Sequence, residues 1–344
     1  MVAKNSSLLS CWPDGYSRYY SVTNLLSIVF KKNSIRILDV GGDSEWMSKF
    51  LDATDVSYDL TIIDTRKPDF VNKKDNIHYL QKDFFTVDAT SFSAEAVINT
   101  DVLEHIPANL KEPFIEKCIE IAESVAVFSA PQNHDDVTRA EKQINKNYID
   151  FSGKQQYWLK EHFEFGKPNF NTVESIAESK GLPYITIATN NLENWALSFS
   201  INLINSEVVP LDGVDELNRY YNKNIHTVGD FTGNPYRKIT IVFKDKKLYE
   251  SSKRNIEKFF QPDTTSHLDF ILKSLQLITD NFSVLSKDYD STKQKLSDLD
   301  REHSLTLKNL RQTQEAYVSV SKELNVLKSS RVYRYLSRFG FLHK

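Results

Sequence analysis

The stretch IRILDVGGDSEW (residues 35–46) leads an apolar strand into a glycine pair, Gly41 and Gly42. Further apolar runs of strand length follow, and segments with helical spacing separate them. These runs span residues 60–63, 77–80, 96–99, 125–129, 184–189 and 238–244. Runs that are apolar throughout fit strands covered by helices on both faces. The sequence therefore predicts an α/β fold with a doubly wound sheet.

The composition narrows the class of protein. A chain of 344 residues with 40% hydrophobic residues is long enough for one α/β domain plus an appendage. The net charge of −3 argues against general nucleic-acid binding. Cys11 and Cys118 are isolated, so we expect reduced thiols. Without an apolar segment of membrane-spanning length or a secretory leader pattern, the sequence predicts a cytoplasmic protein.

Acidic residues gather at the expected carboxyl ends of the strands. They are Asp39, Asp43, Asp64, Asp83, Asp101 and Glu104. The loop GGDSEW lacks the full glycine fingerprint of dinucleotide-binding folds, and an acidic rim would repel a pyrophosphate. The same rim suits a ligand with a sulfonium, an ammonium and a ribose diol. The charge pattern therefore favours S-adenosylmethionine (SAM) over a nicotinamide or flavin dinucleotide.

Four motifs in order make the sequence resemble class I SAM-dependent methyltransferases of the glycan and small-molecule type, with a Rossmann-like sheet. They are LDVGG (38–42), IIDT (62–65), QKDFF (81–85) and NTDVLEHIP (99–107). A helix over 108–122 and a strand ending in SAP (129–131) follow them. The resemblance covers roughly residues 10 to 245. At position 43, family members commonly have glycine where this chain has aspartate, so the following helix is expected to start differently or to be capped by Asp43.

The resemblance implies a set of cofactor-binding residues. Gly41 and Gly42 would approach the methionine part, and Asp64 would bind the ribose. Asp83 would accept a hydrogen bond from the adenine amino group, with Phe84 beside the ring. The remaining candidates are Asp39, Asp101 and Val102, with Arg18 and Trp46 as weaker ones.

The base that would assist methyl transfer is less defined than the cofactor site. His134 and Asp135 follow the fifth strand, on the expected substrate side. The segment 157–168 places His162 near Glu161 and aromatic residues, which suits a sugar acceptor and proton transfer. A structural lid is the alternative for this segment, and a loop-ordering role is the alternative for His105. No spacing supports a metal cluster of His134, Asp135 and His162, so no metal site is expected.

Residues 268–327 follow a heptad pattern. Fourteen of the eighteen a and d positions are apolar or aromatic, counting Leu268 as a, and no glycine or proline interrupts them. This pattern predicts a coiled coil of roughly 90 Å at about 1.5 Å per residue, and hence a homo-oligomer, either a dimer or a trimer. An amphipathic helix packed on its own domain is the alternative.

The last segment, residues 328–344, carries five basic residues, several aromatic ones and no acidic residue. Such a helix can bind the surface of an anionic membrane, and a cap that folds back on the coil or binds a partner is the alternative. Its ending resembles that of bacterial surface-polysaccharide assembly proteins. We therefore expect domains at 1–250 (methyltransferase), 251–267 (linker), 268–327 (coil) and 328–344 (tail).

Together these patterns predict a SAM-dependent O-methyltransferase, peripheral at the inner face of the cytoplasmic membrane. Its expected acceptor is a sugar of a lipid-linked surface polysaccharide, and the coil would set a distance to a glycosyltransferase partner. One alternative is a scaffold with a degenerate methyltransferase fold, for which Asp43 would be the symptom. Another is a methyltransferase for a small metabolite or a protein side chain.

Overall fold

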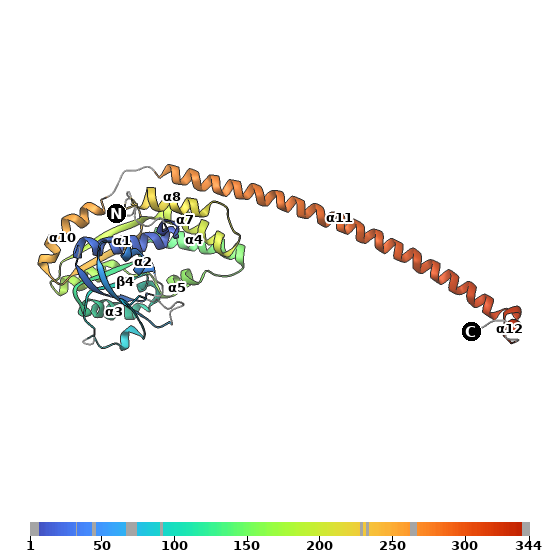
Figure 1. Ribbon diagram of the computed structural model, residues 1–344, viewed down its shortest axis with the longest axis horizontal. Coiled ribbons are helices and arrows are strands. Elements are labelled where there is room, and N and C mark those ends of the chain that lie inside the picture. Colours follow the sequence, from blue (N-terminus) through green and yellow to red (C-terminus); the bar gives the residue numbers. More distant parts are fainter. Residues whose placement is uncertain are drawn as a thin grey trace. The chain divides into compact units, whose positions relative to one another are not determined.

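The computed structural model describes residues 7–31, 33–42, 46–66, 74–89, 92–227, 230–231, 234–261 and 267–338 (Figure 1). The chain divides into two compact units, residues 1–278 and 279–344. The first unit contains a seven-stranded sheet in the order β3-β2-β1-β4-β5-β7-β6. Its strands are β1 (Ser34–Val40), β2 (Ser57–Asp64), β3 (Ile77–Gln81), β4 (Ala94–Thr100), β5 (Ala122–Pro131), β6 (Tyr184–Asn191) and β7 (Pro235–Phe243).

Helices precede, connect and follow these strands. The α-helices up to β7 are α1 (Pro13–Phe30), α2 (Trp46–Asp52), α3 (Ala108–Ile121), α4 (Asp135–Ser152), α5 (Tyr157–Phe165), α6 (Phe170–Ser179), α7 (Leu192–Glu207) and α8 (Val214–Tyr221). Beyond β7 come α10 (Lys246–Phe259), α11 (Leu268–Ser329) and α12 (Arg331–Arg338). Short 3-10 turns are η2 (Leu8–Ser10), η3 (Phe84–Thr86) and η5 (Leu103–His105), and η6 (Asn222–His226) is a π-helical turn.

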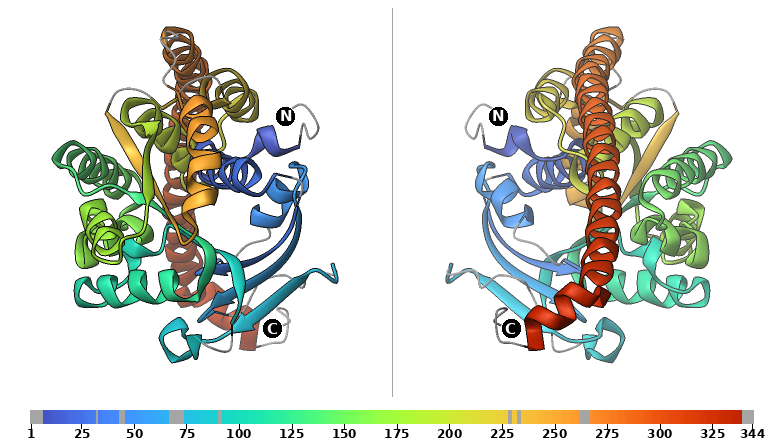
Figure 2. Two further views of the ribbon diagram at one scale, coloured as in Figure 1. Left: turned by 90° about the vertical axis from the view of Figure 1, so that its left-hand side faces the viewer. Right: turned by 90° about the vertical axis from the view of Figure 1, so that its right-hand side faces the viewer.

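Apolar side chains on both faces of the sheet explain the continuous apolar runs. Along β5, Val125 and Val127 join the core under α1, α2 and α10. Their neighbours Ala126 and Phe128 join the core under α3 and α6. Successive strand residues point to opposite faces, so a strand with helices on both sides is apolar throughout (Figure 2). The predicted doubly wound, Rossmann-like fold is confirmed.

One strand departs from the parallel sheet. β7 lies between β5 and β6 and is antiparallel to both. Because Pro235 pairs with Asn191, the segment 192–234 leaves and re-enters the sheet at the same edge. This is the edge at which the parallel strands end, so α7 and α8 belong to the side where ligands bind in such sheets.

The predicted long helix is present as α11, and its first three turns use a face that the heptad pattern did not indicate. Phe270, Ser274 and Leu277 are buried, and the two apolar ones pack with α7 and α8 in one cluster. These residues occupy c and g positions. All fourteen apolar or aromatic a and d side chains of α11 are exposed. Among the described residues, no helix is both long and apolar enough to span a membrane.

The expected linker over residues 251–267 is helical in its first part, because α10 runs from Lys246 to Phe259. Ser252 and Ile256 of this helix are buried, and Ile256 belongs to the core under the sheet. Residues 262–266 lie outside the described residues. α10 is therefore part of the first compact unit.

Candidate functional site

A cavity of about 480 Å³ lies at the carboxyl ends of β1, β2 and β4 and is closed by parts of α1, α5 and α7. The sheet contributes Val40, Gly41 and Gly42 after β1, Asp64 to Arg66 after β2, and the loops around residues 82–85 and 100–106. The covering helices contribute Arg18 of α1, Trp158 and His162 of α5, and Phe199 of α7. The segments 132–169, between β5 and α6, and 192–234, between β6 and β7, therefore both reach the cavity.

The backbone conformation at position 41 and the close packing at positions 41 and 42 require glycine. Gly41 has a φ of +83°, which favours glycine, and a Cβ there would lie 2.2 Å from Val102 Cγ2. At Gly42 a Cβ would lie 2.4 Å from Asp39 Oδ2. The Gly41 N–H donates to the Ile63 carbonyl at 2.7 Å, which ties the loop to β2. The backbone can therefore approach a ligand closely here. Asp43, whose expected cap depends on this loop, lies outside the described residues.

Eight of the ten residues expected to bind the cofactor line the cavity. They are Arg18, Gly41, Gly42, Asp64, Asp83, Phe84, Asp101 and Val102. Asp39 is buried behind Gly42, and Trp46 packs against the core with Lys49 Nζ 4.5 Å from its ring centroid. Neither of these two is in the lining, so their roles are in positioning the glycine loop and α2.

Asp64 and Asp83 stand at neighbouring strand ends, because β2 pairs with β3. Asp64 Oδ1 accepts from the backbone N–H of Arg66 at 2.6 Å and from its Nε at 3.2 Å. Asp83 Oδ1 accepts from the backbone N–H of Phe85 at 2.9 Å. Phe84 is nearly buried and packs on Phe114, with ring centroids 5.1 Å apart. Local hydrogen bonds thus hold two carboxylates at the cavity wall.

A group of four charged side chains, called here the paired quartet, lies next to α1, and all of them except Arg237 line the cavity. It comprises Asp14, Arg18, Asp101 and Arg237. Arg18 Nη2 lies 2.8 Å from Asp14 Oδ2 and 2.5 Å from Asp101 Oδ2. Arg237 Nη2 lies 3.2 Å from Asp14 Oδ1, and its Nη1 contacts Asp101 Oδ1. The four charges add to zero.

Three members of the paired quartet, Asp14 and the two arginines, are held in their charged forms. Burial opposes ionisation of Asp14, but Arg18 and Arg237 lower its pKa below the ordinary value. Burial lowers the pKa of Arg237 to about 10, which still leaves it charged at neutral pH. Asp101 has a φ of +54°, and its N–H donates to the Ser129 carbonyl at 2.8 Å. The two arginines therefore stabilise an aspartate in a strained backbone conformation.

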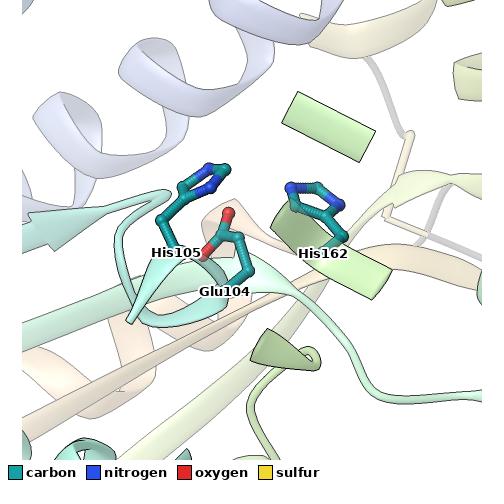
Figure 3. A group of neighbouring side chains, drawn as sticks. All are labelled: Glu104, His105 and His162. Carbon is teal, nitrogen blue, oxygen red and sulfur yellow. The ribbon is translucent and has the colours of Figure 1, made fainter. Parts of the chain in front are cut away.

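A second group, called the open triad, lies on the cavity wall and comprises Glu104, His105 and His162 (Figure 3). One nitrogen or oxygen from each side chain lies within 4.8 Å of the others. Glu104 is fully buried, and among the described residues neither of its carboxylate oxygens has a hydrogen-bond partner. A buried carboxylate in this state costs free energy unless a ligand or a proton compensates it.

Further carboxylates lie behind both histidines. His162 Nδ1 is 2.9 Å from Glu141 Oε1, and His105 Nδ1 is 2.8 Å from Glu161 Oε2. Glu141 is fully buried and also accepts from Lys167 Nζ at 2.6 Å and from the Tyr236 hydroxyl at 3.2 Å. Glu141 therefore fixes the ring of His162 and leaves Nε2 as its free nitrogen.

Burial also changes the acid–base properties around the open triad. It raises the pKa of Glu104 to about 8 and lowers the pKa of His105 to about 3, the latter with help from nearby positive groups. The pKa of Lys111, close to Glu104, falls to about 8 for the same reason. The open triad is thus poorly suited to carry charge by itself, in contrast to the paired quartet.

Two of the three residues expected to be catalytic lie away from the cavity. His134 is half exposed and caps α4, where its Nδ1 accepts from the Asp136 N–H at 3.3 Å. Asp135 is the first residue of α4 and borders a shallow depression beside Arg139. His162 lines the cavity. His105, for which a loop-ordering role was the alternative, also lines the cavity. The rings of His105 and His162 have centroids 5.1 Å apart.

Sequence reasoning missed Asp14, Glu141 and Arg237. A charged residue directly before the apolar run 238–244 was a usable signal for Arg237. The four-residue spacing of Asp14 and Arg18 on a helix was another. Glu141 gave no signal, because a glutamate in a polar helix is ordinarily exposed.

No protein-family model matches the sequence, and no curated protein matches it. Solved structures show a similar chain path at low identity. A plantazolicin methyltransferase in complex with SAH has 10% identity and a TM-score of 0.42, over 68% of this chain and 85% of the other. A magnesium protoporphyrin IX methyltransferase from Synechocystis with bound SAH has 13% identity and a TM-score of 0.40, over 67% and 84%. A cyclopropane-fatty-acyl-phospholipid synthase-like protein from Lactobacillus casei has 11% identity and a TM-score of 0.37, over 66% and 92%.

Proposed function

We propose that the protein is a SAM-dependent O-methyltransferase. The observation that carries this proposal is the cavity itself. Its glycine loop admits no side chain at either glycine, and carboxylates follow both β2 and β3. In this proposal Asp64 binds the ribose hydroxyls and Asp83 accepts a hydrogen bond from the adenine amino group. When bound, SAM supplies an electrophilic methyl group on a sulfonium.

The protein supplies alignment and a place for the acceptor. Methyl transfer to a hydroxyl is an in-line displacement that releases one proton. His162 lines the cavity, and Glu141 holds its Nδ1. We therefore assign His162 to the acceptor hydroxyl. Covering helices α5 and α7 restrict access of water to this end.

Aromatic side chains support a sugar acceptor. Trp158 and Phe199 line the cavity, and Tyr157 is exposed beside Trp158 with ring centroids 5.0 Å apart. Aromatic faces suit the C–H faces of sugar rings, while Glu161 can accept from a sugar hydroxyl. We extend the proposal to a sugar of a lipid-linked surface polysaccharide, methylated at the inner face of the cytoplasmic membrane.

Binding of S-adenosylhomocysteine to the full chain tests the cofactor site. Asp64→Asn should weaken binding by about 10- to 100-fold, because a hydrogen bond to a charged group contributes about 1.5–3 kcal/mol. Asp59→Asn is the matched control, since Asp59 lies on the same strand and is exposed. Isothermal titration measures both. Absent binding by the unaltered chain would favour the scaffold alternative.

Assembly through α11 is the second part of the proposal. The a and d side chains are exposed even where the c and g positions pack on the domain, so the heptad face is available to further copies of this chain. Leu296→Asp with Leu299→Asp should dissociate the oligomer. Leu305→Asp, an exposed leucine at a c position, should not. Analytical ultracentrifugation decides this, and a monomeric unaltered chain would refute assembly.

The tail completes the proposal. α12 exposes Arg331, Arg334 and Arg338 together with Val332 and Tyr335. Basic and apolar residues on one short helix favour contact with anionic headgroups. We expect the full chain to sediment with anionic vesicles and to be released when the three arginines are replaced by glutamate. Equal sedimentation of both proteins would contradict a role for the tail.

A further inference from the structure

We propose that Glu104, His105 and His162 bind a divalent transition-metal ion at the acceptor end of the cavity. Two imidazoles and one carboxylate on one face are the donor set that Zn²⁺ and Fe²⁺ take in catalytic sites with open positions. Glu104 and His105 come from η5, directly after β4, and His162 comes from α5 (Figure 3). Residues 57 or more positions apart in the sequence thus meet at one point.

The first argument is the state of Glu104. It is fully buried, and its two oxygens have no hydrogen-bond partner among the described residues, although a native buried carboxylate normally has several. Lys111, the nearest cation on α3, donates instead to the carbonyls of Leu103 and Gly166, each at 2.5 Å. Glu104 is therefore aimed at a site that the protein's own donors leave unfilled.

The second argument is what lies behind the histidines. A histidine that binds a metal through one nitrogen usually has its other nitrogen held by a carboxylate, which fixes the tautomer and raises the basicity of the ring. His162 Nδ1 is held by Glu141 at 2.9 Å, and His105 Nδ1 faces Glu161 at 2.8 Å. His162 thus has this outer carboxylate, and its Nε2 is left for the ion. At His105 a carboxylate oxygen lies close to Nδ1, but this nitrogen has no hydrogen-bond partner among the described residues.

The third argument is distance. Two atoms that each lie about 2.1 Å from a zinc ion are at most about 4.2 Å apart. The donor atoms of the open triad lie within 4.8 Å of one another. Rotation of the side chains on binding would have to close this difference, and no hydrogen bond among the described residues restrains the Glu104 carboxylate. The cavity provides the entry path, because all three side chains line it.

The function of the ion follows from its place. An ion held by these residues would lie at the cavity wall, where an acceptor hydroxyl would become a further ligand and lose its proton more easily, the proton passing to water. His162 would then act on the hydroxyl as a ligand of the ion and not as its base. This role rests on the proposed methyltransferase function, whereas metal binding itself does not.

The test uses the full chain after treatment with a chelator. We expect one equivalent of Zn²⁺ to bind in competition with a chromophoric chelator, and Co²⁺ to give the visible absorption of a site with nitrogen ligands. Mg²⁺, which prefers oxygen ligands, should not compete. Glu104→Gln and His162→Ala should abolish this binding, while His134→Ala, an exposed histidine outside the cavity, should leave it intact.

Two further measurements test the metal site: Zn²⁺ binding after replacement of Glu141, and the effect of Zn²⁺ on the melting temperature. Glu141→Gln should weaken Zn²⁺ binding by about 10- to 100-fold. Zn²⁺ should raise the melting temperature of the unaltered chain but not that of Glu104→Gln or Glu104→Leu. If Zn²⁺ binds equally to the unaltered chain and to both Glu104 variants, or does not bind at all, the inference is wrong. Binding of S-adenosylhomocysteine to the same preparations is measured separately, so a failed metal site and a failed cofactor site are distinguishable.

Discussion

The two charged groups at the cavity walls solve the problem of buried charge in opposite ways. In the paired quartet, Arg18 and Arg237 each contact both Asp14 and Asp101. In the open triad, Glu104 has no hydrogen-bond partner among the described residues, although it is fully buried. The charges of the paired quartet compensate one another, so this group can position a ligand without needing one for its own stability. Glu104 of the open triad has no such compensation, so a bound group would complete this wall.

Removing Arg237 should cause the largest loss of stability. Arg237→Met leaves Asp14 and Asp101 buried with one arginine between them, which we expect to lower the free energy of unfolding by about 3–5 kcal/mol. Chemical denaturation measures this value. Arg254→Met, a change to an exposed arginine of α10, is the matched control and should have little effect. A small effect of Arg237→Met would mean that the quartet is not a unit.

Replacing Glu104 should change the free energy of unfolding in the opposite direction from replacing Arg237. In chelator-treated protein, Glu104→Leu replaces a buried group without hydrogen-bond partners by an apolar one of similar length. We expect the free energy of unfolding to rise by about 1–3 kcal/mol. Denaturation of both proteins in the same buffer decides this. A destabilised variant would show that Glu104 has a structural role and would erase the contrast with the quartet.

Acidification should separate the groups in a third way. The pKa of Asp14 is lowered in the folded state by Arg18 and Arg237, so its stabilising effect is complete above its ordinary value of 3.8 and declines below it. The stability advantage of the unaltered chain over Asp14→Asn should therefore shrink as the pH falls below 3.8, by at most about 1.4 kcal/mol per pH unit. Thermal melts across this range measure it. A constant difference would mean that the pKa is not lowered.

The smallest effect is expected at the rim of the open triad. Glu161 is partly exposed and faces His105. Glu161→Gln should change the free energy of unfolding by less than about 1 kcal/mol, because the lowered pKa of His105 leaves its ring neutral and the pair is not ionic. If this change instead destabilises the protein as strongly as Arg237→Met, the rim is part of the fixed structure.

Much of the fold was predictable because local pattern decides it. Short-range signals predict the strands that end in the four motifs, the glycine loop and the long helix. The antiparallel β7 was not predictable, because its partner β5 is about a hundred residues away in the chain. The same reason hid the packing of Phe270 and Leu277, whose partners lie on α7 and α8.

The residues of the site also divide into those that local pattern predicts and those that depend on distant parts of the chain. The predicted cofactor residues follow strand ends of a parallel sheet, so their meeting follows from the fold class. The partnership of Arg237 with Asp101 depends on the placement of β7 next to β5, and that of His162 with Glu104 depends on how α5 folds over the sheet. His134 was expected near the substrate because it follows β5. Instead it is the N-cap residue of α4, and its ring accepts a hydrogen bond from the Asp136 N–H.

The return of the chain at the Asn191–Pro235 pair has a consequence for how such a protein changes over time. Because the segment between them starts and ends at one edge of the sheet, its length and sequence can vary while every strand keeps its register. Phe199 of α7, the cavity-lining residue of this segment, can thus be exchanged while the residues at the strand ends stay in place. The segment is one contiguous piece of chain, which makes it a natural unit for grafting in protein engineering.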